Sequence, residues 1–536
     1  MRKFLLSLFV WAWATASGGL AQAPEPRLVV LLAVDQFRGD YPDRFAAHFS
    51  GGLRRLFAEG RHYANADLNY ASTETGPGHA TMATGTYPRV HGIHGNDWID
   101  RTTGRSVYCV GDPEAGPVDG LGGGSSPRNL RVSALGDWLK AASPRSKVVA
   151  ISGKDRAAVL LGGQRPDAAY WYESRSGQWV SSSYYLKRLP EWVRRYNARR
   201  WVYNQVPEAW TRLEPESLYA RQGPDAFPFE TPWNGSTAFP HPFDPARKPA
   251  QVGNAPFLDA YTLDFAWQAV RAERLGRRGV VDLLCIGLSA TDYVGHAFGP
   301  DSHELLDQLL RLDRELGRFL ERLERYVGRD RLLVILTADH GVLELPEFLE
   351  QFRGLAARRL LYGQAIEPGL ERLNRALGLL WGVEEPLLLP GYMLNYAAAA
   401  RVGVDSLTLE RYVREGLLRI PGVADVYLRR ELMREGDPDR PYLGHFRRSY
   451  HPPRGEDLQI RYCERCLVTS RPTGTTHGSP YRYDTHVPIV FWGAGVRPGR
   501  VAEPVYTVDI APTVARLLGI PYPDTVSGRP LDVANR

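Results

Sequence analysis

Five short apolar runs, separated by longer amphipathic stretches, limit most strongly what this chain can fold into. The runs lie at residues 27–34, 147–152, 280–288, 331–337 and 487–492. Continuous apolar runs of this length are typical of strands buried on both faces of a sheet. The sequence therefore predicts five central strands.

Helical patterns lie between these runs. Residues 302–327 place leucines mostly on one face and arginine and glutamate on the other, and a further helix is expected to begin near Asp509 and to end before Gly519. Alternating strands and helices are typical of an α/β fold, so we expect a mostly parallel central sheet with helices on both faces.

Two long segments break this alternation. Residues 159–255 are rich in Tyr, Trp, Pro and Arg, and residues 346–468 mix helical and strand-like patches. A chain of 536 residues, with 43% apolar and 24% charged residues, has the composition of a globular enzyme and the length for a large core. We therefore expect one catalytic domain over residues 24–536, with both segments inserted into it as a cap.

The first residues have the layout of an export signal. Arg2 and Lys3 precede an apolar run at 4–16, and small residues follow up to an Ala-Gln-Ala sequence at 21–23. The run is shorter than the ~20 residues that a spanning helix needs, so we expect a signal peptide at 1–23, cleaved after one of these two alanines. The mature protein is expected in the periplasm or outside the cell, free of the membrane after cleavage, and as a monomer.

The cysteines do not predict a structural zinc site, and the net charge does not predict nucleic-acid binding. Cys463 and Cys466 form a C-x-x-C sequence without two more zinc ligands nearby, which leaves a local disulfide or two thiols as alternatives. Cys285 lies inside an apolar run and is expected to be buried. The net charge is only +6 and the basic residues are scattered, so we expect no nucleic-acid partner.

Acidic residues and histidines follow three of the predicted strands. Asp35 comes directly after the first strand, Asp292 and His296 follow the strand that ends near Leu288, and Asp339 and His340 follow Thr337. Each aspartate alone has a simpler interpretation as a helix cap or turn residue. Together they are expected to converge, because the carboxyl ends of parallel strands meet at one edge of an open α/β sheet.

Aspartate with neutral histidine is the ligand set of zinc and similar divalent ions, whereas calcium and magnesium prefer oxygen ligands throughout. His477, in the Thr-Thr-His-Gly-Ser sequence before the last strand, offers one more imidazole. Six such ligands suffice for two ions but leave open positions for a substrate and a nucleophile, as a catalytic site requires.

The candidate nucleophile is Thr75. Pro77 suits the first turn of a helix, which places Thr75 near a helix N-terminus, where backbone N–H groups favour an anion. A metal ion would supply the alkoxide that a free threonine hydroxyl does not form. The alternative is that Thr75 only caps the helix.

Three further polar residues are candidates for binding a substrate. Asn96 lies in a glycine-flanked loop that suits either an amide donor or a plain turn. Lys154 and Arg156 follow another strand, and on an extended backbone they would share one face. The alternative for this pair is a solvated charged loop.

These motifs, in this order, resemble those of the secreted, threonine-nucleophile alkaline phosphatases of the PafA type. The matching segments are Leu-Ala-Val-Asp-Gln at 32–36, Thr-Gly-Pro-Gly-His at 75–79, Gly-Asn-Asp-Trp at 95–98, Lys-Asp-Arg at 154–156, Thr-Asp-Tyr-Val-Gly-His at 291–296, Thr-Ala-Asp-His-Gly at 337–341 and Thr-His-Gly at 476–478. In addition, residues 508–513 resemble the closing helix of the wider alkaline phosphatase superfamily. The resemblance covers nearly the whole mature chain.

The resemblance implies two zinc ions per chain and a role for each motif residue. One zinc would be bound by Asp292, His296 and His477, and the other by Asp35, Asp339 and His340, with Thr75 bridging to the substrate. Asn96, Lys154 and Arg156 would contact phosphoryl oxygens, and His486 would lie behind the ligands. The implied reaction is hydrolysis of phosphate monoesters through a phosphothreonine intermediate.

A charge count supports phosphate monoesters as the substrate class. Two divalent ions balance three aspartates and a Thr75 alkoxide, so Lys154 and Arg156 leave two positive charges, which a monoester dianion cancels and a diester monoanion does not. A phosphodiesterase or nucleotide pyrophosphatase with the same ligands is the main alternative. A sulfatase is disfavoured because no C-x-P-x-R sequence is present, and a binding protein without turnover because the ligands, Thr75 and the donors are all intact.

Overall fold

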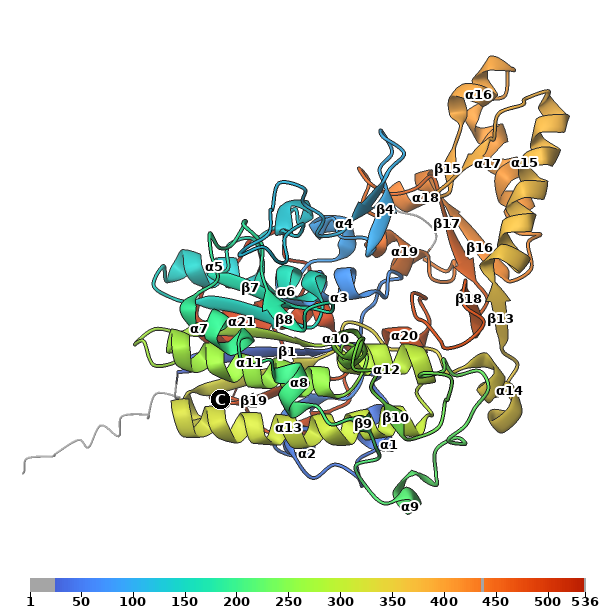
Figure 1. Cartoon of the computed structure of the whole chain (residues 1–536). Coiled ribbons are helices and arrows are strands. Elements are labelled where there is room, and N and C mark those ends of the chain that lie inside the picture. The colour runs from blue at the N-terminus through green and yellow to red at the C-terminus, as the bar shows by residue number, and fades with distance from the viewer. Residues whose placement is uncertain (1–24, 435–437, 535–536) are drawn as a thin grey trace, which may run out of the picture.

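A nine-stranded sheet runs through the centre of the computed structural model, which describes residues 25–434 and 438–534 (Figure 1). The strand order is β20 (Gly499–Val501), β2 (Arg61–Tyr63), β19 (Ile489–Gly493), β12 (Leu332–Thr337), β1 (Leu28–Val34), β11 (Asp282–Leu288), β6 (Val148–Ser152), β7 (Ala168–Glu173) and β8 (Gln178–Val180). All five predicted strands are confirmed within this sheet, and the mostly parallel arrangement is confirmed from β12 to β7. The predicted signal peptide at 1–23 lies outside the described residues.

The strand β19 is antiparallel to both of its neighbours, β12 and β2. It is antiparallel to β12, with Leu336 opposite Val490 and Leu333 opposite Gly493. The start of β19 therefore lies beside the end of β12, at the carboxyl edge of the parallel strands. For this reason the segment that precedes β19, which contains His477, reaches the same edge as residues that follow the parallel strands.

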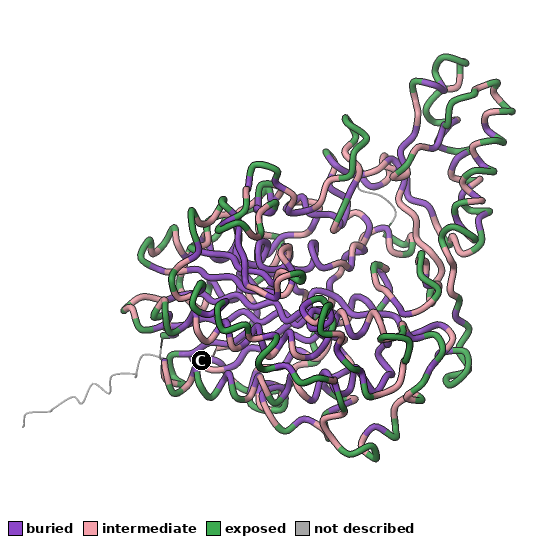
Figure 2. The backbone as a smooth tube through the Cα atoms, in the orientation of Figure 1, coloured by how far each residue is buried: buried purple, intermediate pink, exposed green. Residues whose placement is uncertain are grey.

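Helices cover both faces of the sheet, as predicted. Along β1 the side chains alternate between two buried clusters, with Leu28, Val30, Leu32 and Val34 in one and Val29, Leu31 and Ala33 in the other. The first cluster includes α11 (Phe257–Glu273), α12 (Ala290–Phe298) and α13 (His303–Val327), and the second includes α3 (Thr75–Thr84), α5 (Leu135–Ala142), α6 (Asp155–Gly162) and α21 (Ile510–Leu518). Figure 2 shows the buried backbone concentrated in this part of the molecule.

The predicted amphipathic helices are present with nearly the expected bounds. In α13 the hydroxyl of Ser302 accepts a hydrogen bond from the Leu305 amide at 3.1 Å and so caps the first turn. The other predicted helix, α21, ends at Gly519, which adopts a left-handed conformation with φ of 63°. Each large apolar side chain buried under these helices stabilises the fold by about 1.5 to 3 kcal/mol.

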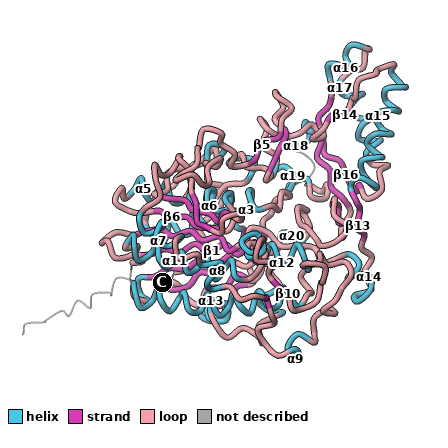
Figure 3. Tube along the Cα trace, viewed as in Figure 1, coloured by secondary structure: helices cyan, strands magenta, loops and turns pink. Residues whose placement is uncertain are grey.

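The segment 346–468 contains a lobe that extends from the main body (Figure 3). Its elements include α15 (Glu367–Trp381), α16 (Tyr396–Arg401), α17 (Ser406–Leu417), β16 (Val423–Leu428) and β17 (Leu458–Tyr462). The lobe has its own buried cluster, which includes Leu373, Val413 and Val426. Cys463 and Cys466 are joined by a disulfide, which selects the first of the two sequence-based alternatives, and Cys285 is buried as predicted.

The segment 159–255 begins inside α6 and contributes β7 and β8 to the edge of the main sheet. After β8 it continues through α7 (Glu191–Asn197), α8 (Trp201–Gln205), α9 (Glu216–Tyr219) and α10 (Lys248–Val252). Among the described residues, none of the helices combines the length and the apolar character that crossing a bilayer requires.

Candidate active site

The predicted acidic residues and histidines meet at the carboxyl edge of the sheet. Asp35 follows β1, Asp292 and His296 lie in α12 after β11, and His340 follows β12. Nε2 of His296 lies 3.2 Å from Asp292 Oδ1, and Nε2 of His340 lies 3.5 Å from Asp35 Oδ1. His477 joins them from the segment before β19, with Nε2 3.7 Å from Asp292 Oδ1.

The three histidines share one orientation. Each Nδ1 lies within hydrogen-bond distance of a backbone carbonyl: Thr475 for His296 at 2.8 Å, Gly341 for His340 at 2.9 Å and Thr73 for His477 at 2.6 Å. Because a carbonyl only accepts, each Nδ1 carries a proton, and in the neutral form of each ring the lone pair of Nε2 faces the carboxylates. Backbone contacts that fix the tautomer in this way are typical of metal-binding histidines.

The donor atoms form two groups that fit divalent ions. The ligand atoms of Asp292, His296 and His477 lie within 4.8 Å of one another, and so do those of Asp35, Asp292 and His340. Asp35 Oδ1, Asp339 Oδ2 and His340 Nε2 are buried and have no hydrogen-bond partner within the described residues. Buried polar atoms without partners are costly, and cations bound to nitrogen and carboxylate donors would satisfy them.

Asp339 lies beside the second group. Its Oδ2 is 3.5 Å from Nε2 of His340 and 3.2 Å from Nδ1 of His79, and its Oδ1 accepts a hydrogen bond from the His340 amide at 3.0 Å. Burial alone would raise the pKa of Asp339, but His340 and His79 lower it overall. The carboxylate is therefore available as a ligand next to His340.

Thr75 is the first residue of α3, and Glu74 rather than Thr75 is the N-cap residue. The side chain of Thr75 is buried, and its Oγ1 lies 3.4 Å from Nζ of Lys154 and 3.3 Å from Nη2 of Arg156. Two cationic donors thus face one hydroxyl oxygen, an arrangement that stabilises negative charge on it. Gly78 allows α3 to pack closely against Asp339, because a Cβ at this position would lie 2.5 Å from Cβ of Asp339.

Asn96 is held against the start of α3 by two hydrogen bonds. Its side-chain Oδ1 accepts a hydrogen bond from the backbone N–H of Gly76 at 2.7 Å. Its backbone N–H donates to Glu74 Oε2 at 2.8 Å. The side-chain oxygen is therefore occupied, which leaves the Nδ2 group as the donor that remains for a substrate. Burial raises the pKa of Glu74.

Lys154 and Arg156 both reach Thr75, although the extended backbone considered for this motif is present only at Lys154. Lys154 is extended at the N-cap position, whereas Arg156 lies in the first turn of α6, because the chain enters the helix at Asp155. Nζ of Lys154 also lies 2.7 Å from Asp35 Oδ2 and 2.5 Å from Asp292 Oδ2. Burial would lower the pKa of Lys154, but these two carboxylates raise it, so the ammonium stays charged.

Sequence reasoning missed residues that hold the ligands in place. Gln36 has a left-handed backbone with φ of 63°, and it donates from Nε2 to Asp292 Oδ1 at 2.8 Å and from its amide to Asp339 Oδ1 at 3.1 Å. Gly295 leaves space for it, because a Cβ there would lie 1.9 Å from Gln36 Oε1. The available signal was that Gln36 directly follows Asp35.

Tyr293 contacts Lys154, whereas His486 lies outside the ligand groups. The ring of Tyr293 lies 5.0 Å from Nζ of Lys154, a cation–π contact that sequence reasoning also missed. His486, which was expected behind the ligands, lies with Nε2 3.0 Å from the carbonyl oxygen of Ala64 and outside both ligand groups.

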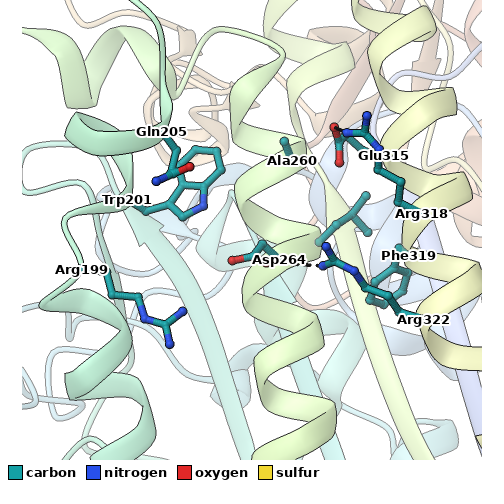
Figure 4. A pocket seen from close by; sticks show the side chains of 10 residues that line it. Arg199, Trp201, Gln205, Ala260, Asp264, Glu315, Arg318, Phe319 and Arg322 are labelled. Atoms are coloured by element: carbon teal, nitrogen blue, oxygen red, sulfur yellow. Dashed lines mark hydrogen bonds and ion pairs between the residues drawn. The ribbon is translucent and has the colours of Figure 1, made fainter. Parts of the chain in front are cut away.

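A cleft of about 760 Å³ opens at this site and is lined by Arg156, Asp292, Tyr293 and His296, among others. A separate cavity of about 310 Å³ lies between α8, α11 and α13 and shares no lining residue with the cleft (Figure 4). Its charged groups largely pair with each other, with Arg322 3.6 Å from Asp264 and Arg318 2.6 Å from Glu315. The cleft is therefore the better candidate for substrate binding.

Comparisons with known proteins agree with the geometry. Residues 29–362 match the family model described as type I phosphodiesterase / nucleotide pyrophosphatase. The chain is 33% identical to alkaline phosphatase PafA of Elizabethkingia meningoseptica, over 99% of this chain and 98% of that protein. It is 35% identical to alkaline phosphatase PhoV of Synechococcus elongatus, over 94% of this chain and 92% of that protein.

A solved structure shares the fold. The crystal structure of wild-type PafA superposes with a TM-score of 0.88 at 32% sequence identity, and the match covers 96% of this chain and all of the PafA chain.

Proposed function

The chain belongs to the PafA-type alkaline phosphatases, within the type I phosphodiesterase / nucleotide pyrophosphatase family, and we propose that it hydrolyses phosphate monoesters with Thr75 as the nucleophile. The observation that carries this proposal is the position of the Thr75 hydroxyl. Its oxygen lies within hydrogen-bond distance of the cationic ends of Lys154 and Arg156, and Lys154 in turn contacts Asp35 and Asp292 of the ligand groups.

The reaction proposed for these residues has two steps. Thr75 Oγ, having lost its proton to solvent, forms a bond to phosphorus while the ester P–O bond breaks, and the departing alkoxide takes a proton from water. Water then forms a new P–O bond as the bond to Thr75 breaks, which releases inorganic phosphate and returns a proton to the threonine. The covalent intermediate is a phosphothreonine.

Asn96, Lys154 and Arg156 are proposed to hold the phosphoryl oxygens. Since Oδ1 of Asn96 accepts from the Gly76 amide, its Nδ2 is free to donate. The guanidinium of Arg156 presents a planar pair of donors, and the ammonium of Lys154 adds a point charge. All three groups act on charge that is spread over the transferring phosphoryl group.

Two zinc ions per chain are proposed to complete the site. Asp292, His296 and His477 would hold one, and Asp35, Asp339 and His340 the other, with Thr75 beside them; the mixture of imidazole and carboxylate donors favours zinc. Ions bound there would favour deprotonation of the threonine hydroxyl and of water and would stabilise negative charge on the departing oxygen.

The location and oligomeric state are proposed from the sequence. We propose that the chain is exported to the periplasm or the medium, with the signal peptide at 1–23 removed, and that it works there as a monomer. The Cys463–Cys466 disulfide supports an oxidising compartment.

The experiment that tests the proposed function is acid quenching of the enzyme during turnover of an aryl phosphate, followed by mass spectrometry of the peptide that contains Thr75. We expect a phosphate group on Thr75. Thr75→Ala should bind phosphate but lose turnover, and Thr75→Ser, which keeps a hydroxyl, should retain part of it. Turnover by Thr75→Ala at the wild-type rate would exclude Thr75 as the nucleophile.

Metal analysis provides a second, independent test. We expect two equivalents of zinc in the purified protein, loss of activity and a lower Tm on chelation, and recovery of both when zinc is added back. A fully active protein without bound metal would contradict the proposal.

A further inference from the structure

The cleft at the active site carries positive charge beyond the catalytic residues. Arg247 and Arg471 line it together with Arg156. Asp292 is the one acidic side chain among the described residues that line it, and this carboxylate is already in contact with Lys154 and His296. Apart from Arg156, Asp292 and His296, the charged residues that line the cleft are therefore both basic.

Neither outer arginine is strongly neutralised. Within the described part of the chain, the side chain of Arg471 makes no ion pair or hydrogen bond, and it is exposed. Arg247 makes only long contacts, with Nε 3.9 Å from Asp244 Oδ2 and Nη2 3.4 Å from Asn234 Oδ1. Both guanidinium groups are thus available to a ligand in the cleft.

The position of the cleft assigns it to the alcohol part of a substrate. Arg156 joins it to Thr75, since its Nη2 lies 3.3 Å from Thr75 Oγ1, and the half-buried His296 connects it to one ligand group. Asp35, Asp339 and His340 are buried and do not line the cleft. For a phosphoryl group bound beside Thr75 and Arg156, the cleft lined by Arg247 and Arg471 is therefore the space available to the ester substituent.

We propose that this cleft is a leaving-group subsite that selects phosphate monoesters whose alcohol carries a second anionic group, a carboxylate or a further phosphate, bound by Arg471 and Arg247. This inference rests on the proposed monoesterase function and adds the substrate class. A basic cleft with protein walls concentrates the field on such a group, whereas an uncharged alcohol gains nothing from the two arginines.

The test uses pairs of esters that differ in one charge. Gluconate 6-phosphate and glucitol 6-phosphate have the same primary phosphate ester, and only the first has a carboxylate at the far end. Phosphoglycerate and glycerol phosphate form a second pair, in which the carboxylate lies closer to the phosphate. We expect kcat/KM of the charged ester to exceed that of its uncharged partner by about threefold to tenfold in at least one pair.

Variants assign the preference to the two arginines. Arg471→Ala and Arg247→Ala should each reduce the charged-to-uncharged ratio by about threefold, and the double variant should bring it close to unity. The matched control is Arg419→Ala, which removes an exposed arginine in the lobe at 346–468 and should leave the ratio unchanged. Salt at about 1 M, which screens exposed charges, should also reduce the ratio.

Three outcomes would overturn the inference. One is equal kcat/KM within both pairs, and another is a preference that persists in the double variant. A third is an equal loss on both members of a pair, which would mean that the arginines only attract the phosphoryl dianion. Failure of the proposed function is distinct, because the wild-type enzyme would then fail to hydrolyse the uncharged esters as well. Unchanged Tm values of the variants exclude misfolding.

Discussion

The ammonium nitrogen of Lys154 lies 2.5 Å from Oδ2 of Asp292, a residue that belongs to both groups of ligand atoms. The same nitrogen lies 2.7 Å from Asp35 Oδ2. A lysine in this position neutralises part of the charge of the buried carboxylates and repels any cation that binds to them.

Lys154→Met should therefore bind zinc more tightly than the wild type while losing monoesterase activity. Removing one positive charge a few ångströms from the ions should raise the zinc affinity by about tenfold or more. A competition titration with a chromophoric chelator measures this affinity without reference to turnover. Unchanged or weaker zinc binding would show that Lys154 does not oppose the cations.

Glu74 is predicted to act by positioning Asn96. Glu74→Ala removes the acceptor for the backbone N–H of Asn96 and should lower kcat/KM for an aryl phosphate by about tenfold. Glu74→Gln keeps a side-chain oxygen, so its kcat/KM should remain within about threefold of the wild type. In the double variant with Asn96→Ala, the effect of Glu74→Ala should largely disappear. Full additivity of the two losses would argue against this role.

Arg156 is predicted to set the preference for monoesters over diesters. Arg156→Ala should reduce kcat/KM for an aryl phosphate by about a hundredfold and that for the matching bis-aryl diester much less, because a diester has one charge fewer to balance. Arg156→Lys keeps the charge but not the planar pair of donors, and should recover only part of the loss. Faster turnover of the diester by the wild-type enzyme would favour the phosphodiesterase alternative.

Glu230 is predicted to make the folded protein less stable at alkaline pH. It is buried near Glu304, and burial, together with the charge of Glu304, raises the pKa of Glu230 from 4.5 to about 10. As the pH rises from about 4.5 to about 10, the unfolded chain releases a proton that the folded chain retains, so the folded state loses stability over this range.

Glu230→Gln removes this titration. Its Tm should exceed that of the wild type by about 1 to 4 °C near pH 9, and the difference should vanish near pH 4. Thermal unfolding followed by circular dichroism at both pH values measures the difference. An equal Tm difference at both pH values would contradict the assignment.

The sequence alone was sufficient to place the site residues that follow recognisable strands. Asp35, Asp292 and Asp339 could be placed together because apolar runs mark the strands and parallel strands end at one edge. The position of His477 depends on the direction of β19, which a run of apolar residues does not encode. Lys154 and Arg156 were identified, but their backbone was not, because the strand changes into a helix within the motif.

Residues that support the site were harder to predict. Gln36 and Glu74 act through hydrogen bonds to a ligand or to Asn96, and neither residue type indicates chemistry by itself. Their roles depend on contacts between segments far apart in the chain, such as Gln36 with Asp292, and these contacts exist only after the sheet has formed.

The order of strands at one edge of the sheet has a consequence for biosynthesis. β2 is made early, but its partners are β19 and β20, which are among the last strands to be translated. This edge, and with it the loop that carries His477, cannot form until nearly the entire polypeptide has left the ribosome. The proposed set of ligands, and with it the affinity for ions, is therefore complete only when translation has nearly finished.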